Sequence, residues 1–214
     1  MTTGPHQGQR VVAAGAPLEQ ARGAVVMVHG RGASPESILT LVQPLARPEF
    51  AYLAPAAAGG TWYPNGFMTP IPGNEPGITS GLRAIADVLG MLQVSGIPPE
   101  RTVLLGFSQG ACLSLEYAAR NARRYGGVAT LSGGLIGPDG TPRDYAGSLH
   151  GTPVFLGCSD VDFHIPRERV EFSAGVIAGL GGDVTLRLYP GMGHLVNEDE
   201  IAHVQAMLDG IAGS

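Results

Sequence analysis

A serine in a glycine-flanked turn, Ser108, constrains the fold of this chain more than any other feature. It is the central residue of the sequence Gly-Phe-Ser-Gln-Gly at 106–110. The apolar run 101–105 precedes this sequence, and apolar residues at helical spacing follow it. A serine between a buried strand and a helix is turned sharply outward, and flanking glycines tolerate the backbone angles of such a turn. Because the chain contains 33 glycines, the strand–turn–helix context carries more weight than the five letters.

Short apolar runs alternate with longer helical patterns, which predicts an α/β protein with a mostly parallel sheet and helices on both faces. Residues 24–28 are apolar without interruption, as expected for a strand covered on both sides. The other expected strands are 51–54, 101–105, 127–131, 153–156 and 184–189, and the expected helices are 34–46, 78–94, 109–124, 167–180 and 198–211. No repeat or linker divides the chain, so we expect one domain over residues 1–214.

The composition argues against several functional classes. All 13 basic residues are arginine, so there is no lysine for a P-loop, a pyridoxal phosphate Schiff base or a Ser–Lys pair. The chain contains no H-E-x-x-H or C-x-x-C sequence, which leaves little basis for a zinc site. Cys112 and Cys158 are expected to be small core residues. The net charge of −5 argues against a nucleic-acid partner.

The chain shows no signal for a membrane. No apolar run approaches the roughly 18 residues of a membrane span, so no stable insertion is expected. The polar segment 1–10 lacks the basic-then-apolar pattern of a secretory signal, which predicts a cytoplasmic protein. We expect this segment, which includes His6, to be frayed.

A serine hydroxyl becomes a good nucleophile when a base lies within hydrogen-bond reach and an acid orients that base. Among the six histidines, His194 lies in a glycine-rich loop between the last strand and the last helix. In an open parallel sheet such loops lie at the edge where Ser108 is expected, so His194 is the predicted base. The acid should follow a strand between the two, where Asp160 and Asp162 both qualify and the spacing leaves the choice open.

The intermediate of an acyl transfer also needs N–H donors for its oxyanion. The backbone N–H of Gln109, directly after Ser108, is the first predicted donor. The N–H of Arg31, in the early loop His-Gly-Arg-Gly-Ala at 29–33, is the second. A generic glycine turn, or an anion-binding turn at a helix start, is the alternative interpretation of that loop.

Residues 56–77 form a long segment without helical or strand periodicity, and such loops are commonly functional. The aromatic residues Trp62, Tyr63 and Phe67 argue against disorder, because disordered segments are poor in them. We interpret the segment as a loop that lines or covers a pocket. The acyl group is expected to contact these three side chains or Met192. A packed surface loop is the alternative.

These residues together resemble the carboxylesterase/phospholipase family of α/β-hydrolases, which includes the acyl-protein thioesterases. The resemblance covers nearly the whole chain, and the segments that carry it are 28–32, 106–111, 131–133, 162–166 and 191–194. The family pattern D-P-x-V-P aligns with the fourth segment, which favours Asp162 as the acid although Phe163 replaces the proline. The resemblance implies a cofactor-free hydrolase of esters or thioesters that often acts as a homodimer.

The sequence therefore predicts a serine hydrolase in which Ser108, Asp162 and His194 cleave carboxylic esters or thioesters through an acyl-enzyme intermediate. Short to medium acyl chains are expected, because the sequence contains no extended apolar lid domain. Carboxylic ester, thioester and lysophospholipid are all compatible natural substrates. An acyltransferase or perhydrolase with the same triad is one alternative, and a non-catalytic binding module is another.

Overall fold

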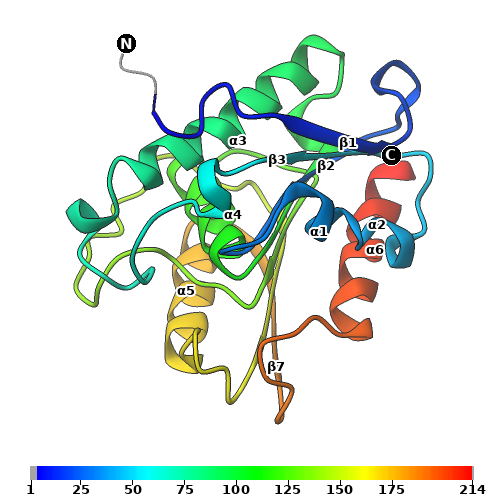
Figure 1. Ribbon diagram of the computed structural model, residues 1–214. Helices are drawn as coiled ribbons and strands as arrows, with labels where there is room; N and C mark the ends of the chain where they lie inside the picture. Colours follow the sequence, from blue (N-terminus) through cyan, green and yellow to red (C-terminus); the bar gives the residue numbers. More distant parts are fainter. Residues whose placement is uncertain (1–3, 214) are drawn as a thin grey trace.

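A seven-stranded sheet forms the centre of the molecule (Figure 1). The computed structural model describes residues 4–213. The strands lie in the order β1-β3-β2-β4-β5-β6-β7, and all neighbours are parallel except β1 and β3. Their bounds are β1 Val11–Gly15, β2 Ala24–Val28, β3 Ala51–Pro55, β4 Thr102–Phe107, β5 Gly127–Leu131, β6 Pro153–Ser159 and β7 Asp183–Tyr189. The predicted α/β class with a mostly parallel sheet is confirmed.

Helices cover both faces of this sheet (Figure 1). One face carries α3 (Gly77–Val94), α4 (Gln109–Arg120) and α5 (Arg167–Gly179), and the other carries α1 (Pro35–Leu39), α2 (Val42–Leu45) and α6 (Glu198–Ala212). In β2, Val26 and Val28 pack under the first group, and Val25 and Met27 pack under the second. Successive side chains of a strand point to opposite faces, so a strand covered on both sides is apolar throughout.

The parallel strands bring four loops to one edge of the sheet. The register pairs Val28 at the end of β2 with Gly106 in β4, and it pairs Ser159 at the end of β6 with Tyr189 at the end of β7. The loops that follow these strands therefore leave the sheet on the same side, although they are far apart in the sequence. Among residues 4–213, no helix is both long and apolar enough to span a membrane.

The helix predicted over 34–46 is instead two short helices, α1 and α2. Pro44 explains the break, because proline lacks an N–H and its ring crowds the carbonyl four positions earlier, at Thr40. The hydroxyl of Thr40 donates to the carbonyl oxygen of Ser37 and closes the end of α1. The helix predicted to end near residue 124 ends at Arg120.

The amino-terminal segment is also more ordered than predicted. His6 is only 4% exposed, its Nε2 lies 2.8 Å from the carbonyl oxygen of Trp62, and its Nδ1 accepts the N–H of Ala58. The expectation of a frayed end is therefore wrong at His6, whereas residues 1–3 lie outside the described residues. Strand β1 follows this segment and was not predicted from its short, weakly alternating sequence.

A buried carboxylate stands at the amino end of α6. Glu200 is fully buried and forms a reciprocal pair with Asn197, whose N–H donates to Glu200 Oε2 at 3.0 Å. Glu200 Oε1 has no hydrogen-bond partner among the described residues, and it occupies the space that a side chain at Gly157 would fill. Burial penalises the charged form and raises the pKa of Glu200 to about 7.

We expect the free energy of unfolding of Glu200→Gln to increase relative to that of the wild type as the pH rises. A carboxyl whose pKa is raised on folding stabilises the protein fully below its unfolded pKa, and this stability is lost as the pH rises through the folded value. A rise from 4.5 to about 7 corresponds to about 3 kcal/mol at most. Urea unfolding at pH 5 and pH 8 should show the advantage of the variant growing by about 1–3 kcal/mol.

Glu198→Gln is the matched control, because Glu198 is an exposed carboxylate in the same helical turn. Its effect on unfolding should change little between the two pH values. An equal pH response in both variants would contradict the role given to the burial of Glu200.

Candidate active site

Ser108 lies in a sharp turn between β4 and α4. Its φ of 55° and ψ of −120° lie in a region that residues other than glycine rarely adopt. The neighbouring glycines make this turn possible: a Cβ at Gly106 would lie 2.3 Å from the carbonyl oxygen of Gly110, and one at Gly110 would lie 2.1 Å from that of Val28. The N–H of Ser108 donates to the carbonyl oxygen of Leu131 at 3.0 Å and holds the turn against β5.

Ser108, His194 and Asp162 form a continuous hydrogen-bonded chain. His194 Nε2 lies 2.8 Å from Ser108 Oγ, and His194 Nδ1 lies 2.7 Å from Asp162 Oδ2. An ionised carboxylate only accepts hydrogen bonds, so Nδ1 carries the proton and Nε2 accepts the proton of the Ser108 hydroxyl. The three residues come from the loops after β4, β6 and β7, which the parallel sheet brings to one edge.

The environment of Asp162 favours its charged form. Its side chain is fully buried, and Oδ1 accepts the N–H groups of His164 and Ile165 at 2.8 and 3.1 Å. Burial opposes the negative charge, but the hydrogen bonds from His194 and from the two backbone groups outweigh it and keep the pKa of Asp162 below its usual value. The thiol of Cys158 lies 3.7 Å from Oδ2.

Asp160, the alternative acid, makes a different contact. Its Oδ1 accepts the N–H of Gly191 at 2.8 Å, and the hydroxyl oxygen of the adjacent Ser159 accepts the N–H of Gly193 at 3.0 Å. Both bonds hold the loop that carries His194. The geometry therefore favours Asp162 as the partner of His194 and makes Asp160 an anchor of the His194 loop.

A cavity of about 320 Å³ opens beside Ser108 and His194. Tyr63 and Phe67, two of the predicted pocket residues, line this cavity together with other side chains, which include Cys112, Ile165 and His164. The ring of His164 lies edge-on to that of His194, with centroids 4.9 Å apart. Within residues 4–213, no group of three or more His, Cys, Asp or Glu side chains is placed to hold a metal ion.

Trp62 and Met192 are not among the described residues that line the cavity, which corrects the prediction for both. Trp62 is fully buried in the core, and its indole N–H donates to the carbonyl oxygen of His29 at 2.9 Å. The sulfur of Met192 contacts the side-chain amide of Asn197 at 2.9 Å. An aromatic residue in a glycine-rich loop suggests a pocket wall, and nothing local in the sequence indicates that its ring is buried beneath the loop.

Side chains from the two proposed oxyanion segments hold the loop 56–77 in place. Gln109 donates from Nε2 to the carbonyl oxygen of Tyr63 at 2.8 Å and accepts the N–H of Trp62 on Oε1 at 2.9 Å. The guanidinium of Arg31 donates to the carbonyl oxygens of Pro64 and Asn65. The sequence pointed only to the backbone N–H groups of Gln109 and Arg31, because contacts between residues 46 positions apart leave no local pattern.

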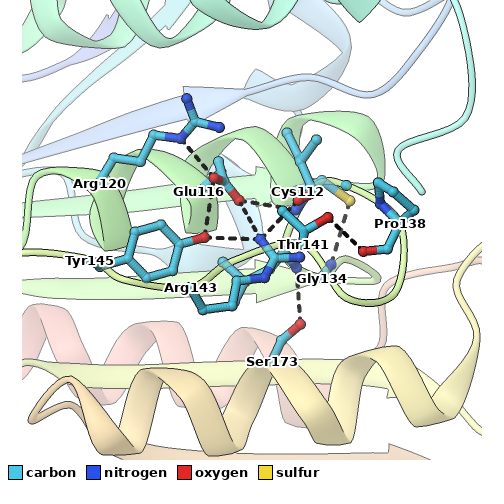
Figure 2. Close-up of polar contacts among 12 residues, drawn as sticks. Cys112, Glu116, Arg120, Gly134, Pro138, Thr141, Arg143, Tyr145 and Ser173 are labelled. Atoms are coloured by element: carbon cyan, nitrogen blue, oxygen red, sulfur yellow. Dashed lines mark hydrogen bonds and ion pairs between the residues drawn. The ribbon is translucent and has the colours of Figure 1, made fainter. Parts of the chain in front are cut away.

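A buried carboxylate on α4 fixes a second loop next to the cavity (Figure 2). Glu116 is 1% exposed, and the groups that contact its carboxylate are Arg120, the N–H of Ile136, the Tyr145 hydroxyl and the guanidinium of Arg143. Figure 2 shows the side chains of Arg120, Arg143 and Tyr145 pointing toward the Glu116 carboxylate. The N–H of Gly137 in the same loop donates to the carbonyl oxygen of Phe67 at 2.7 Å, so this cluster also supports the cavity wall.

The sheet order, the strand–turn–helix at Ser108 and the chain of Ser, His and Asp side chains define an α/β-hydrolase fold. More narrowly, this chain belongs to the phospholipase/carboxylesterase family, whose model matches residues 7–211. This confirms the resemblance inferred from the sequence.

Individual relatives agree with this family. The crystal structure of a phospholipase/carboxylesterase from Dyadobacter fermentans has a TM-score of 0.91 and 38% identity, and the match covers 97% of this chain and 98% of that protein. Acyl-protein thioesterase 1 of Gibberella zeae is 38% identical over 120 residues, which are 53% of this chain and 49% of the relative. A probable carboxylesterase of Oryza sativa subsp. japonica is 26% identical over 143 residues, 65% of this chain and 54% of the relative. This chain thus spans about half the length of the curated relatives it matches.

We expect Gln109→Leu to destabilise the fold even though it keeps the backbone N–H at this position. The substitution leaves the buried N–H of Trp62 and the buried carbonyl of Tyr63 without partners, and each unpaired group costs about 1–3 kcal/mol. Urea unfolding should therefore show a loss of about 2–5 kcal/mol. Gln93→Leu on the exposed side of α3 is the control and should change stability by less than about 0.5 kcal/mol. Similar losses in both variants would show that Gln109 does not hold the loop.

Proposed function

We propose that this chain is a serine hydrolase that cleaves carboxylic esters or thioesters of short to medium acyl chains. One observation carries the proposal: the hydrogen-bonded chain from Ser108 through His194 to the buried Asp162, with a cavity beside its serine end. Membership of the phospholipase/carboxylesterase family supports ester chemistry.

In the proposed mechanism, Ser108 Oγ attacks the acyl carbonyl carbon while its proton passes to His194 Nε2. The resulting tetrahedral intermediate collapses when His194 gives that proton to the leaving alcohol or thiol, and the acyl group stays bonded to Ser108. A water molecule then loses a proton to His194 and attacks the acyl carbonyl carbon. His194 returns this proton to Ser108 Oγ as the bond between Oγ and the acyl carbon breaks, which releases the carboxylic acid and the free serine. Asp162 keeps the imidazole in the required tautomer and stabilises the imidazolium that forms in each half of the reaction.

The backbone N–H groups of Gln109 and Arg31 are the proposed oxyanion donors. Gln109 is the first residue of α4, and the first N–H groups of a helix have no partner within it. Gly30, which precedes Arg31, approaches the nucleophile so closely that a Cβ there would lie 3.4 Å from the Cβ of Ser108. The N–H of Gly32 donates to the carbonyl oxygen of Gly60 at 2.7 Å and fixes the loop that contains Arg31.

The cavity lining supports an acyl site of limited length. Tyr63, Phe67 and Ile165 provide apolar surface, and hydrogen bonds to the backbone carbonyls of Tyr63 and Phe67 hold the loop 56–77 that supplies the first two residues. A panel of esters and thioesters of graded acyl length tests the preference and separates carboxylic esters, thioesters and lysophospholipids. The homodimer, the cytoplasmic location and the single domain stay predictions.

We expect a fluorophosphonate probe to label this protein once, at Ser108, because a phosphonate ester forms only on an activated serine. Ser108→Ala should abolish the labelling and reduce hydrolysis of a 4-nitrophenyl ester by at least about 10³-fold. Ser132→Ala is the control, because Ser132 is fully buried in the next loop at the same sheet edge, and it should keep the label. Labelling that persists in the alanine variant at 108 would exclude this nucleophile.

Asp162→Asn should be far more damaging to catalysis than Asp160→Asn. An asparagine at 162 offers an amide in place of a carboxylate and favours the wrong imidazole tautomer, which lowers kcat by about 10³–10⁴-fold. An asparagine at 160 keeps an oxygen that accepts the N–H of Gly191, so the loss there should stay below about tenfold. Steady-state kinetics on variants with unchanged circular dichroism measure both effects. The reverse ranking would give the acid role to Asp160.

A further inference from the structure

The cavity beside Ser108 carries positive charge but no carboxylate. Arg31 contributes to its lining, and none of the described residues that line it is an aspartate or a glutamate. The composition does not explain this, because the chain has 18 acidic and 13 basic residues. The acid of the proposed triad, Asp162, is fully buried and hydrogen-bonded on both oxygens, so it presents no charged surface to a substrate.

The guanidinium of Arg31 is held in place without being neutralised. It donates to the carbonyl oxygens of Pro64, at 2.7 Å, and of Asn65, and its carbon lies 6.0 Å from the centre of the Tyr63 ring. None of these groups carries a formal charge, and the salt bridges among the described residues do not include Arg31. Arg31 is also exposed, and the two carbonyl bonds use only two of its five N–H donors.

An arginine fixed in this way is suited to bind an anion. The planar guanidinium matches carboxylate and phosphate oxygens, and a side chain that is already ordered loses little freedom on binding. Arg31 and Ser108 line the same cavity, so a substrate that fills this cavity meets both residues. An uncompensated positive charge at a concave site also raises the local concentration of anionic substrates.

We propose that Arg31 is a specificity-determining residue that selects esters or thioesters carrying a carboxylate or phosphate group a few atoms from the scissile carbonyl. This inference rests on the proposed serine hydrolase function. The anionic group belongs either to the acyl chain or to the leaving group, since both parts of the substrate meet at Ser108.

Two pairs of substrates, matched in size, test the proposal and distinguish the two sources of the anion. Monoethyl glutarate against ethyl pentanoate places the charge on the acyl chain, and 4-acetoxybenzoate against its methyl ester places it on the leaving group. We expect kcat/KM of the wild type to favour the anionic member at least about tenfold in one pair at low ionic strength. The preference should fall towards one in about 0.5 M salt, because salt screens an exposed charge. A ratio near or below one in both pairs overturns the proposal.

Two variants separate the charge of Arg31 from its contacts with the loop. Arg31→Gln should lower the anionic-to-neutral ratio at least about fivefold, and Arg31→Lys, which keeps the charge but loses the planar fork of donors, should lower it by less. The ratio compares two substrates on one protein, so a general loss of activity cancels. Arg22→Gln is the matched control: Arg22 is an exposed arginine that also binds a backbone carbonyl, but it precedes β2 whereas Arg31 follows it.

An equal change of the ratio in Arg31→Gln and Arg22→Gln would overturn the role of Arg31, and so would an equal loss in Arg31→Gln and Arg31→Lys. These results differ from a failure of the proposed function. In that case, the wild type would hydrolyse neither member of either pair and would take no fluorophosphonate label.

Discussion

The backbone contact between the turn at Ser108 and strand β2 sets the geometry on which the rest of the site depends. A Cβ at Gly110 would lie 2.1 Å from the carbonyl oxygen of Val28, so only a glycine lets α4 begin this close to the strand. Strand β2 continues directly into the loop that contains Arg31. The backbone segments that carry the two proposed oxyanion donors, Gln109 and Arg31, can therefore lie this close together because position 110 has no side chain. A larger residue at Gly110 would increase the distance between the two donors and would also displace the nucleophile.

The same two segments also support the wall of the cavity. A long loop such as 56–77 contains many backbone N–H and carbonyl groups, and those that are buried must find partners. Gln109 and Arg31 supply several of these partners through their side chains, and His29 accepts the N–H of Ala57 at 3.1 Å. The cavity wall and the surroundings of the nucleophile are thus one hydrogen-bonded unit. We therefore expect a substitution in either segment to disturb the other, chiefly through the buried hydrogen bonds of Gln109 and His29.

Much of this arrangement follows from local features of the sequence. A strand buried on both faces needs an unbroken apolar run, which is why the strand over Ala24–Val28 was predicted with its observed bounds. The loops that follow parallel strands meet at one edge, so sequence order and spacing were enough to bring His194 towards Ser108. The break between α1 and α2 also has a local cause in Pro44.

The placement of Trp62 and His6 has no local cause. His6 contacts the carbonyl of Trp62 across 56 positions of sequence, and neither residue lies in a periodic pattern that would show which side of its segment is buried. A histidine near the amino end resembles a frayed residue, and a tryptophan among glycines and prolines resembles a pocket wall. Only the three-dimensional contacts show that the two side chains pack together, with ring centroids 5.1 Å apart.

The surroundings of the buried carboxyl groups of Asp162 and Glu200, and of the Arg31 guanidinium, bear on the charge of the proposed substrate. Asp162 is kept ionised by donors to both of its oxygens, whereas Glu200, with one oxygen unpaired, has its pKa raised to about 7 by burial. Neither group presents negative charge to the cavity. Among residues 4–213, the guanidinium of Arg31 donates to neutral carbonyls of the loop that it holds, so these contacts do not cancel its positive charge. The contacts that order the cavity wall therefore leave a positively charged side chain in the lining that it shares with Ser108. In the selectivity that we propose for Arg31, one side chain both holds this wall and recognises the charge of the substrate.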